Sequence, residues 1–425
     1  MRKLLALIEC CLLPVLSVQG QGAGDLWLFG RDHTLDFRSG TPVPGSGVPG
    51  ADNRSHQQAG AVCDSAGRLL FFVRMITGSG PSARHHTVYD RNGQPMPNGT
   101  LLNEYPVEGV PHIIPAPGNA RKYYILYVKA NGLLYSMVDM DLNNGVGDVI
   151  PNEKNILLEN WGTVIGPKLT VVKGCRSIWV VVRSRVHNQY MSYELTSSGM
   201  APHPVISEAG TLPESFYYSE GSGAVAGLMK ASPDGKKLAV ACWSQRPGNV
   251  GGLELYDFES CSGRIHNPVL IDTVAYYSVC FSSDNTKLYA TSGRDLYQFD
   301  LSLPSAAAIR ASGTLILTNP PVAVYNPILG CYCDTLYPPL RDLKRGPDDK
   351  IYLANNNPHR LPYGYPYMHV IHAPDLPGLA CQPAANALQL THSGFDAGAY
   401  EFYLPADIIS PPHQDTVRSF RHISA

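Results

Sequence analysis

A turn followed by an apolar strand recurs six times in this chain of 425 residues, and this repetition restricts the folds that the chain can adopt. A representative turn is Ser232-Pro233-Asp234-Gly235-Lys236. Pro fixes φ at the start of such a turn, while Asp, Asn and Gly tolerate the bent or left-handed positions that follow. The strands after these turns begin near residues 69, 123, 178, 238, 288 and 351. The nearly even spacing predicts one repeated supersecondary unit rather than two packed sheets.

Each unit continues with a third strand that often ends near an aspartate, as at Asp139, Asp257 and Asp300, and then with a fourth strand, as at 155–158. Four antiparallel strands repeated around an axis predict an all-β chain folded as a seven-bladed β-propeller. Six complete units supply six blades. A strand at 25–30 and another at 399–403 are left over, and we expect them to pair and close the seventh blade, because closure covers both sheet edges.

The N-terminus has the charge pattern of an export signal. Arg2 and Lys3 precede an apolar run from Leu4 to Val18, and Gly20 supplies a small residue for cleavage. The run is too short for a membrane span, and the sequence holds no other candidate span. We therefore expect a signal peptide at 1–20, a propeller at 21–410 and a C-terminal tail at 411–425.

Charge and cysteine content narrow the class of protein. Lys and Arg number 33 against 35 Asp and Glu, and this net charge of −2 argues against nucleic-acid binding. Of the 10 cysteines, only Cys10 and Cys11 fall in the signal region, and an exported chain permits the others to form disulfides. Their pairing cannot be deduced from the sequence.

Several short segments occur in a characteristic order: WLFG at 27–30, LDF at 35–37, MPNGT at 96–100, IIPAPGN at 113–119, VDM at 138–140, GDV at 147–149, KLTVV at 168–172 and GLMK at 227–230. In this order they resemble the propeller modules of exported Bacteroidetes proteins, which are often found ahead of PKD and gliding-motility or type IX sorting modules. The resemblance implies an exported, seven-bladed, YVTN- or WD40-like propeller and carries no assigned catalytic residues.

Aromatic residues gather in the loops of one predicted face. The repeated turns join strand A to strand B of each blade, so the B-to-C loops and the connections between blades lie together on the opposite face. Tyr and Trp combine a flat apolar ring with a hydrogen-bonding tip, which suits sugars and peptides. Either this face binds a ligand or its aromatic side chains only pack the loops. The candidate ligand-binding residues are Trp161, Tyr218, Trp243, Tyr277, Tyr337 and Tyr365.

Polar residues at the starts of innermost strands predict a second candidate site. His112, Lys168, Lys230 and Asp342 each come just before the first turn of a blade, and we expect them to line the central channel. They either face water there or form a pocket for an anionic ligand. A propeller enzyme, such as a lactonase, lyase or glycosidase, would need histidines and carboxylates at the channel mouth, where His112 and Asp342 are the candidates.

One segment has the composition of a calcium loop. Asp139, Asp141, Asn143 and Asp148 offer hard oxygen ligands at short spacing, as Ca²⁺ prefers. However, the glycine of the EF-hand pattern is displaced to the seventh position, at Gly145, and a strand-to-strand turn requires the same residue types. We therefore expect no cofactor and no other metal site, with calcium at this loop as the alternative.

Together these patterns favour a non-catalytic binding or adhesion module of the periplasm, the cell surface or the extracellular space. Its partner would be a glycan, a peptide or a protein, and we expect a monomer. The alternative is a propeller-type enzyme with its site at the channel mouth. The sequence does not identify the ligand.

Overall fold

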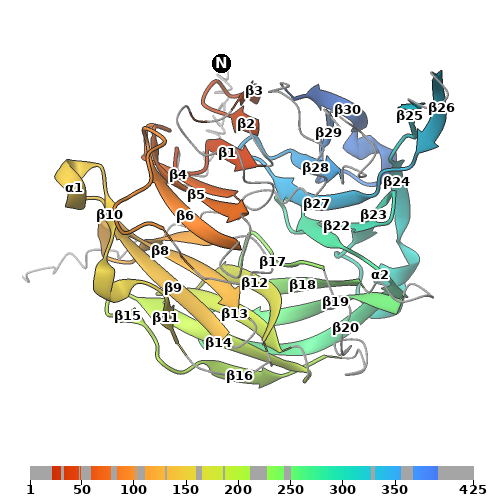
Figure 1. Ribbon diagram of the computed structural model, residues 1–425. Coiled ribbons are helices and arrows are strands. Elements are labelled where there is room, and N and C mark those ends of the chain that lie inside the picture. Colours follow the sequence, from red (N-terminus) through yellow and green to blue (C-terminus); the bar gives the residue numbers. More distant parts are fainter. Residues whose placement is uncertain are drawn as a thin grey trace, which may run out of the picture.

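The computed structural model is a seven-bladed β-propeller, with seven mostly four-stranded antiparallel sheets arranged around one axis (Figure 1). This confirms the fold class predicted from the repeats. The residues that it describes are 22–29, 33–46, 48, 59–77, 84–100, 102, 111–129, 132–158, 165–184, 187–210, 227–243, 250–326, 331–355 and 367–390.

Blades 1 to 4 follow one another along the chain. Blade 1 contains β1 (Leu26–Phe29), β2 (His33–Asp36) and β3 (Val43–Ser46). Blade 2 contains β4 (Ala59–Cys63), β5 (Leu69–Thr77) and β6 (Arg84–Asp90). Blade 3 contains β7 (His112–Ala116), β8 (Asn119–Lys129), β9 (Gly132–Asp139), β10 (Asp148–Val149) and β11 (Ile156–Leu157). Blade 4 contains β12 (Ile165–Lys173), β13 (Ile178–Ser184), β14 (Gln189–Thr196), β15 (Gly199–Met200) and β16 (Val205–Glu208).

Blades 5 to 7 complete the ring. Blade 5 contains β17 (Met229–Ala231), β18 (Lys237–Trp243), β19 (Val250–Glu259) and β20 (Arg264–Val274). Blade 6 contains β21 (Ser278–Phe281), β22 (Lys287–Ser292), β23 (Asp295–Asp300) and β24 (Thr314–Thr318). Blade 7 contains β27 (Leu340–Arg345), β28 (Ile351–Asn355), β29 (Tyr367–Ile371) and β30 (Pro383–Gln389). Between blades 6 and 7, β25 (Val322–Asn326) and β26 (Cys331–Leu336) form a separate hairpin.

Short helices occur only in connections within the described residues. They are α1 (Leu142–Gly145), α2 (Ala306–Ala311) and the 3-10 helices η1 (Pro151–Glu153) and η3 (Gly378–Cys381). None of the described helices is both long enough and apolar enough to cross a membrane.

The turns between strands A and B adopt the left-handed conformation that their sequences predict. Gly235 has φ 67°, and a Cβ there would lie 2.8 Å from the carbonyl oxygen of Lys173 in blade 4, so the position requires glycine. The equivalent residue of blade 6, Asn285, has φ 64°. Its side-chain oxygen accepts a hydrogen bond from the backbone N–H of Asp234 at 3.1 Å, which joins the turns of neighbouring blades.

The six predicted B strands are β5, β8, β13, β18, β22 and β28. The largest difference is in β8, which begins at Asn119 rather than at 123. The strand expected at 25–30 is β1, and it already has a partner in its own sheet, because β1 pairs with β2 and β2 with β3. The sequence did not reveal β3 because Pro44 and Gly45 interrupt its pattern. The strand expected at 399–403 lies outside the described residues, so its pairing stays a prediction.

Seven apolar clusters close the ring, one for each pair of neighbouring blades. The cluster between the first and last blades contains Trp27 and Phe37 of blade 1 and Tyr352 of blade 7. The rings of Trp27 and Tyr352 meet edge to face, with centroids 5.5 Å apart. The ring is therefore closed by packing of blade 1 on blade 7.

A disulfide reinforces one seam of the ring. Cys175 lies in the A-to-B turn of blade 4, and Cys261 lies in the turn between β19 and β20 of blade 5. Beside this bond, the indole N–H of Trp179 donates to the carbonyl oxygen of Ser260 at 2.9 Å. The sequence did not identify this pairing. Cys63, Cys242, Cys280 and Cys381 are buried thiols.

Candidate functional site

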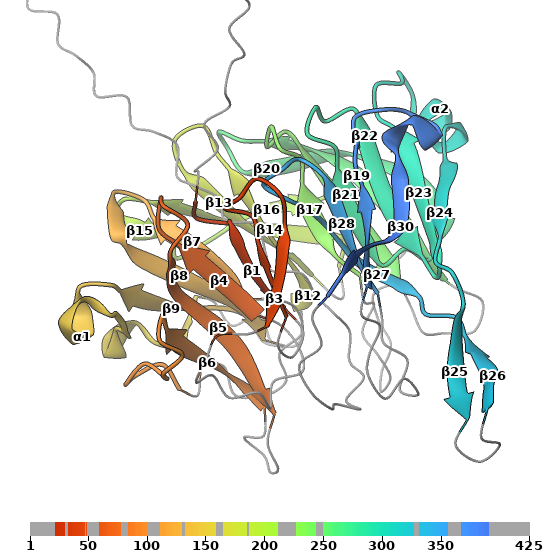
Figure 2. The ribbon, with the colours of Figure 1, turned by 90° about the horizontal axis from the view of Figure 1, so that it is seen from above.

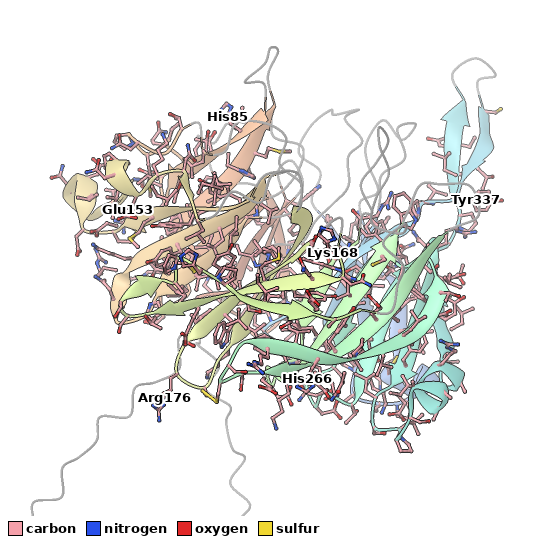
Figure 3. All side chains as sticks on the ribbon, turned by 90° about the horizontal axis from the view of Figure 1, so that it is seen from below. His85, Glu153, Lys168, Arg176, His266 and Tyr337 are labelled. Atoms are coloured by element: carbon pink, nitrogen blue, oxygen red, sulfur yellow. A yellow bond between two sulfur atoms is a disulfide. The ribbon has the colours of Figure 1, made fainter. Side chains whose placement is uncertain are left out.

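The propeller has two unlike faces. The loop face carries the B-to-C loops and the connections between blades, and the turn face carries the A-to-B and C-to-D turns. Figure 3 shows the separation, because Arg176 and His266, which belong to turn-face segments, lie opposite Tyr337. The β25–β26 hairpin is part of a blade connection and projects from the loop face (Figure 2).

Two predicted aromatic residues meet on the loop face. Trp243 is the last residue of β18 in blade 5, and Tyr277 immediately precedes β21 in blade 6. Their ring centroids are 6.0 Å apart, in an edge-to-face arrangement. The guanidinium carbon of Arg341, near the start of β27 in blade 7, lies 5.3 Å from the Trp243 ring centre and 4.4 Å from that of Tyr277. Three consecutive blades thus contribute one aromatic and cationic cluster.

The backbone holds this cluster in place. The N–H of Tyr277 donates to the carbonyl oxygen of Thr291 at 2.8 Å, and the Thr291 hydroxyl donates to the carbonyl oxygen of Arg341 at 3.0 Å. Tyr277 is 2% exposed, so it is not the exposed aromatic residue that we expected from the sequence. Trp243 is half-buried. Arg341 is only 9% exposed, so the cluster is a supported platform in which Trp243 offers most of the accessible surface.

Tyr337 belongs to a different cluster of the loop face. Its side chain is 58% exposed, and the guanidinium carbon of Arg294 lies 4.7 Å from its ring centre. It follows β26 at the base of the projecting hairpin (Figure 3). The other three aromatic candidates, Trp161, Tyr218 and Tyr365, lie outside the described residues.

The axis of the propeller brings two of the four predicted channel residues together. The ammonium nitrogen of Lys230, in β17, lies 2.8 Å from a carboxylate oxygen of Asp342, in β27, and also donates to the carbonyl oxygen of Leu343. Ser278, which starts β21 in the blade between them, donates to the same Asp342 oxygen at 2.9 Å. Blades 5, 6 and 7 are therefore joined by polar contacts close to the axis.

The other two predicted channel residues make different contacts. Lys168 of β12 is 3% exposed and donates to the carbonyl oxygen of Gly227, which precedes β17 in the next blade, at 3.0 Å. In Figure 3 it lies toward the middle of the molecule. His112 starts β7 and is half-buried. We therefore assign Lys168 a contact between neighbouring blades, and Asp342 an ion pair that joins blades 5 and 7.

In the structure, the acidic residues of the predicted calcium loop contact different partners. Asp141 pairs with the guanidinium of Arg121 at 2.8 Å, and Asp139 lies 3.4 Å from the Lys122 ammonium. Both oxygens of Asp148 accept hydrogen bonds from Asn98, from the backbone N–H at 2.9 Å and from the side-chain amide at 2.7 Å. Asn143 has φ 51° within the turn. Within the described part of the chain, no three His, Cys, Asp or Glu side chains are grouped to hold a metal.

Sequence reasoning missed several residues of these clusters. Arg341 directly precedes Asp342 at the start of an innermost strand, and Ser278 has the equivalent place in blade 6, so the rule that selected Asp342 could have found both. It also missed a buried ion pair between blades 4 and 5. The Arg183 guanidinium lies 3.1 Å from the Glu254 carboxylate, and both side chains are at most 1% exposed. Only their placement in successive blades reveals that pair.

Comparison with known proteins adds little to this description. No protein-family model and no curated protein matches the chain. Among solved structures, hydrazine synthase of Kuenenia stuttgartiensis is 14% identical with a TM-score of 0.36, over 65% of this chain and 66% of that one. The chain thus spans just under two thirds of that protein's length. A candidate 6-phosphogluconolactonase from Bacteroides uniformis is 15% identical with a TM-score of 0.45, over 89% of this chain and 99% of that one. Such distant similarities give no information on activity.

Proposed function

We propose that the protein is a non-catalytic propeller that binds a glycan, a peptide or a protein on its loop face. The observation that carries this proposal is the stacking of Arg341 against Trp243 and Tyr277, which come from three consecutive blades. An aromatic and guanidinium surface on a rigid scaffold is typical of residues that dominate binding energy at interfaces. Because Tyr277 and Arg341 are buried and the three side chains pack on one another, little side-chain freedom would be lost on binding.

The polar contacts at the axis favour binding over catalysis. A propeller hydrolase would need an available carboxylate or histidine at the axis. Asp342 is 3% exposed and already accepts hydrogen bonds from Lys230 and Ser278. This arrangement is typical of a carboxylate that holds blades together.

The alternative is an enzyme such as a lactonase, lyase or glycosidase. The gathering of Lys230, Ser278 and Asp342 at the axis is the observation in its favour. Turnover of a lactone or a polyuronide that is lost in Asp342→Asn and in His112→Ala, with both variants folded, would establish it in place of the binding proposal.

Glycan and peptide arrays, followed by alanine variants, test the binding proposal. We expect Trp243→Ala and Arg341→Ala each to weaken binding of the array hit at least tenfold. The control is Leu379→Ala, which truncates a large side chain, 70% exposed, outside the loop face, in η3 on blade 7. Equal affinity in all three variants, or no hit on either array, would contradict the proposal.

We propose further that the chain is exported and acts as a monomer in the periplasm or at the cell surface. The order of Arg2-Lys3 and the apolar run to Val18 supports export, as does the resemblance to exported Bacteroidetes propeller modules associated with PKD and gliding-motility modules. N-terminal sequencing of the secreted protein should begin near residue 21. Recovery of Met1 at the mature N-terminus would refute cleavage, and light scattering measures the oligomeric state.

A further inference from the structure

The β25–β26 hairpin belongs to none of the seven blades. It is a two-stranded sheet that interrupts the connection from β24 to β27. Figures 1 and 2 show it projecting beyond the blades on the loop face, with β25 on the side of the ring and β26 on the outer side. An isolated two-stranded hairpin is only marginally stable in water, so a projecting one gains most when something packs on it or pairs with it.

The base of the hairpin is fixed to the propeller. Asn319, just before the hairpin, is fully buried, and its side-chain amide donates to the carbonyl oxygen of Pro338, just after the hairpin, at 2.8 Å. The same amide donates to the side-chain oxygen of Asn355 in β28 at 2.8 Å. The backbone N–H of Asn319 donates to the carbonyl oxygen of Arg294 at 2.8 Å. The arm therefore stands on blades 6 and 7 at a defined place.

The composition of the arm is unusual for an exposed edge. Between residues 319 and 338 the only charged residue is Asp334. Soluble proteins normally protect projecting strand edges with charged residues, bulges or covering segments. The register of β25 against β26 shifts between Val324 and Asn326, so the arm has one irregularity and one charge. Here the side chains of Tyr332 and Tyr337 are 74% and 58% exposed. The arm thus offers a nearly uncharged surface with exposed tyrosines.

We propose that the arm recruits a polypeptide, and that an extended, largely uncharged segment of a partner protein adds as a third strand to the edge of β25. This inference rests on the proposed function and selects one ligand class within it. Strand addition uses the backbone N–H and C=O groups along an edge, which match another polypeptide backbone. A glycan would be held by side chains alone, whereas the feature that sets this arm apart is the backbone edge of a strand outside the seven blades.

The choice of β25 follows from its position. It faces the ring, where the Trp243, Tyr277 and Arg341 cluster lies on the same loop face. A strand paired with the five residues of β25 would cover about 17 Å at 3.3 Å per residue and could continue toward that cluster. The absence of a charge on β25 predicts a partner segment rich in Val, Ile, Thr or Tyr and poor in charge, because a charged segment would find no counter-charge there.

A display library of random twelve-residue peptides, followed by synthesis of the selected peptides, tests this inference. The two key variants place the same charge on opposite strands, because Ala323 of β25 and Thr335 of β26 are both exposed and lie directly opposite each other. We expect Ala323→Lys to weaken binding of the selected peptide at least tenfold and Thr335→Lys less than threefold. We also expect saturating peptide to slow hydrogen exchange of the amides at 322–326. Unchanged melting temperatures show that both variants are folded.

Four outcomes would overturn the inference. If the peptide binds without protecting 322–326 and loses affinity only in Trp243→Ala or Arg341→Ala, the loop-face proposal stands and the arm is not its site. If the amides at 322–326 are protected in the protein alone, and the protection disappears on dilution with a fall in mass by light scattering, a second copy of the chain occupies the edge. If only glycans bind, the ligand class is wrong, and if neither class binds, the proposed function fails as well.

Discussion

The ammonium of Lys230 lies 2.8 Å from the carboxylate of Asp342, although 112 residues and the whole of blade 6 separate them in the sequence. The contact is possible because β17, β21 and β27 each start at the axis, where the blades are closest together. Ser278 of the intervening blade completes it. Lys230 and Asp342, which the sequence offered as part of a pocket for an anionic ligand, instead join three blades together with Ser278.

Removing one member of this pair should destabilise the propeller. Asp342 is 4% exposed in its side chain and Lys230 21%, so Asp342→Ala leaves a partly buried ammonium without its carboxylate. We expect a loss of about 3 kcal/mol in the free energy of unfolding, measured with urea. The double variant Lys230→Met with Asp342→Leu should recover most of it. A single variant as stable as the wild type would show that the pair does not join the blades.

Acidification should weaken the seam between blades 2 and 3 through His86. Its side chain is fully buried beside Tyr127, and neither ring nitrogen has a hydrogen-bond partner among the residues that the structure describes. Burial lowers the pKa of His86 from 6.5 to about 3. Because the unfolded chain takes up the proton first, stability is complete above about pH 6.5 and falls as the pH drops toward 3.

The free energy of unfolding should fall by about 1.4 kcal/mol per pH unit as the pH drops from 6.5 toward 3. Urea unfolding at several pH values measures it, and His86→Leu is the matched variant. His369 contributes in the same direction, since burial lowers its pKa to about 4, so the comparison is between the two slopes. Identical slopes in His86→Leu and the wild type would mean that His86 is not the group responsible.

Loss of the disulfide should lower stability without changing the fold. Cys175 and Cys261 are 86 residues apart, and closing a loop of that length restricts the unfolded chain by on the order of 4 kcal/mol. We expect Cys175→Ser and Cys261→Ser each to lower the melting temperature, and the double variant to resemble either single one. Circular dichroism is the check that the sheet content is unchanged. Additive losses in the double variant would show that the cysteines act separately.

The seam that closes the ring should be sensitive to Trp27. This residue is 2% exposed, and its ring packs on Phe37 and Tyr352 and lies 5.2 Å from the Lys344 ammonium. Trp27→Ala should cost about 4 kcal/mol, and Trp27→Phe clearly less, by denaturant unfolding. Deletion of the first 40 residues should give an insoluble protein. A soluble deletion variant with unchanged melting would mean that the ring closes without blade 1.

The repeat was readable from the sequence because each blade carries its own local signal. The turn before β18 needs a left-handed residue, and Gly235 supplies it, as Asn285 does before β22. Blade 1 lacked that signal, since β2 and β3 have four residues each and β3 contains Pro44. Contacts between blades depend on how residues from distant segments are aligned along the axis, and no local pattern encodes that alignment.

The candidate site could likewise be predicted from the sequence only in part. Trp243 and Tyr277 were predicted to share a face, and they do meet, but their joint partner Arg341 was not foreseen. The burial of Tyr277 also escaped the sequence, because its ring contacts Trp243 and Arg341, which come from other blades. The aromatic residue types indicated the loop face, but only the folded structure shows that Tyr277 is buried there.

The amide of Asn319 holds the two ends of the hairpin together on a blade that is already complete. The span between those ends is therefore set by the propeller and is independent of what is inserted between them. We expect that replacing the arm by another segment of the same end-to-end span leaves the ring, its seams and its melting behaviour unchanged. Other segments that start and end at that spacing could be grafted at Asn319 and Pro338, and the propeller would then present a new binding element without redesign of its core.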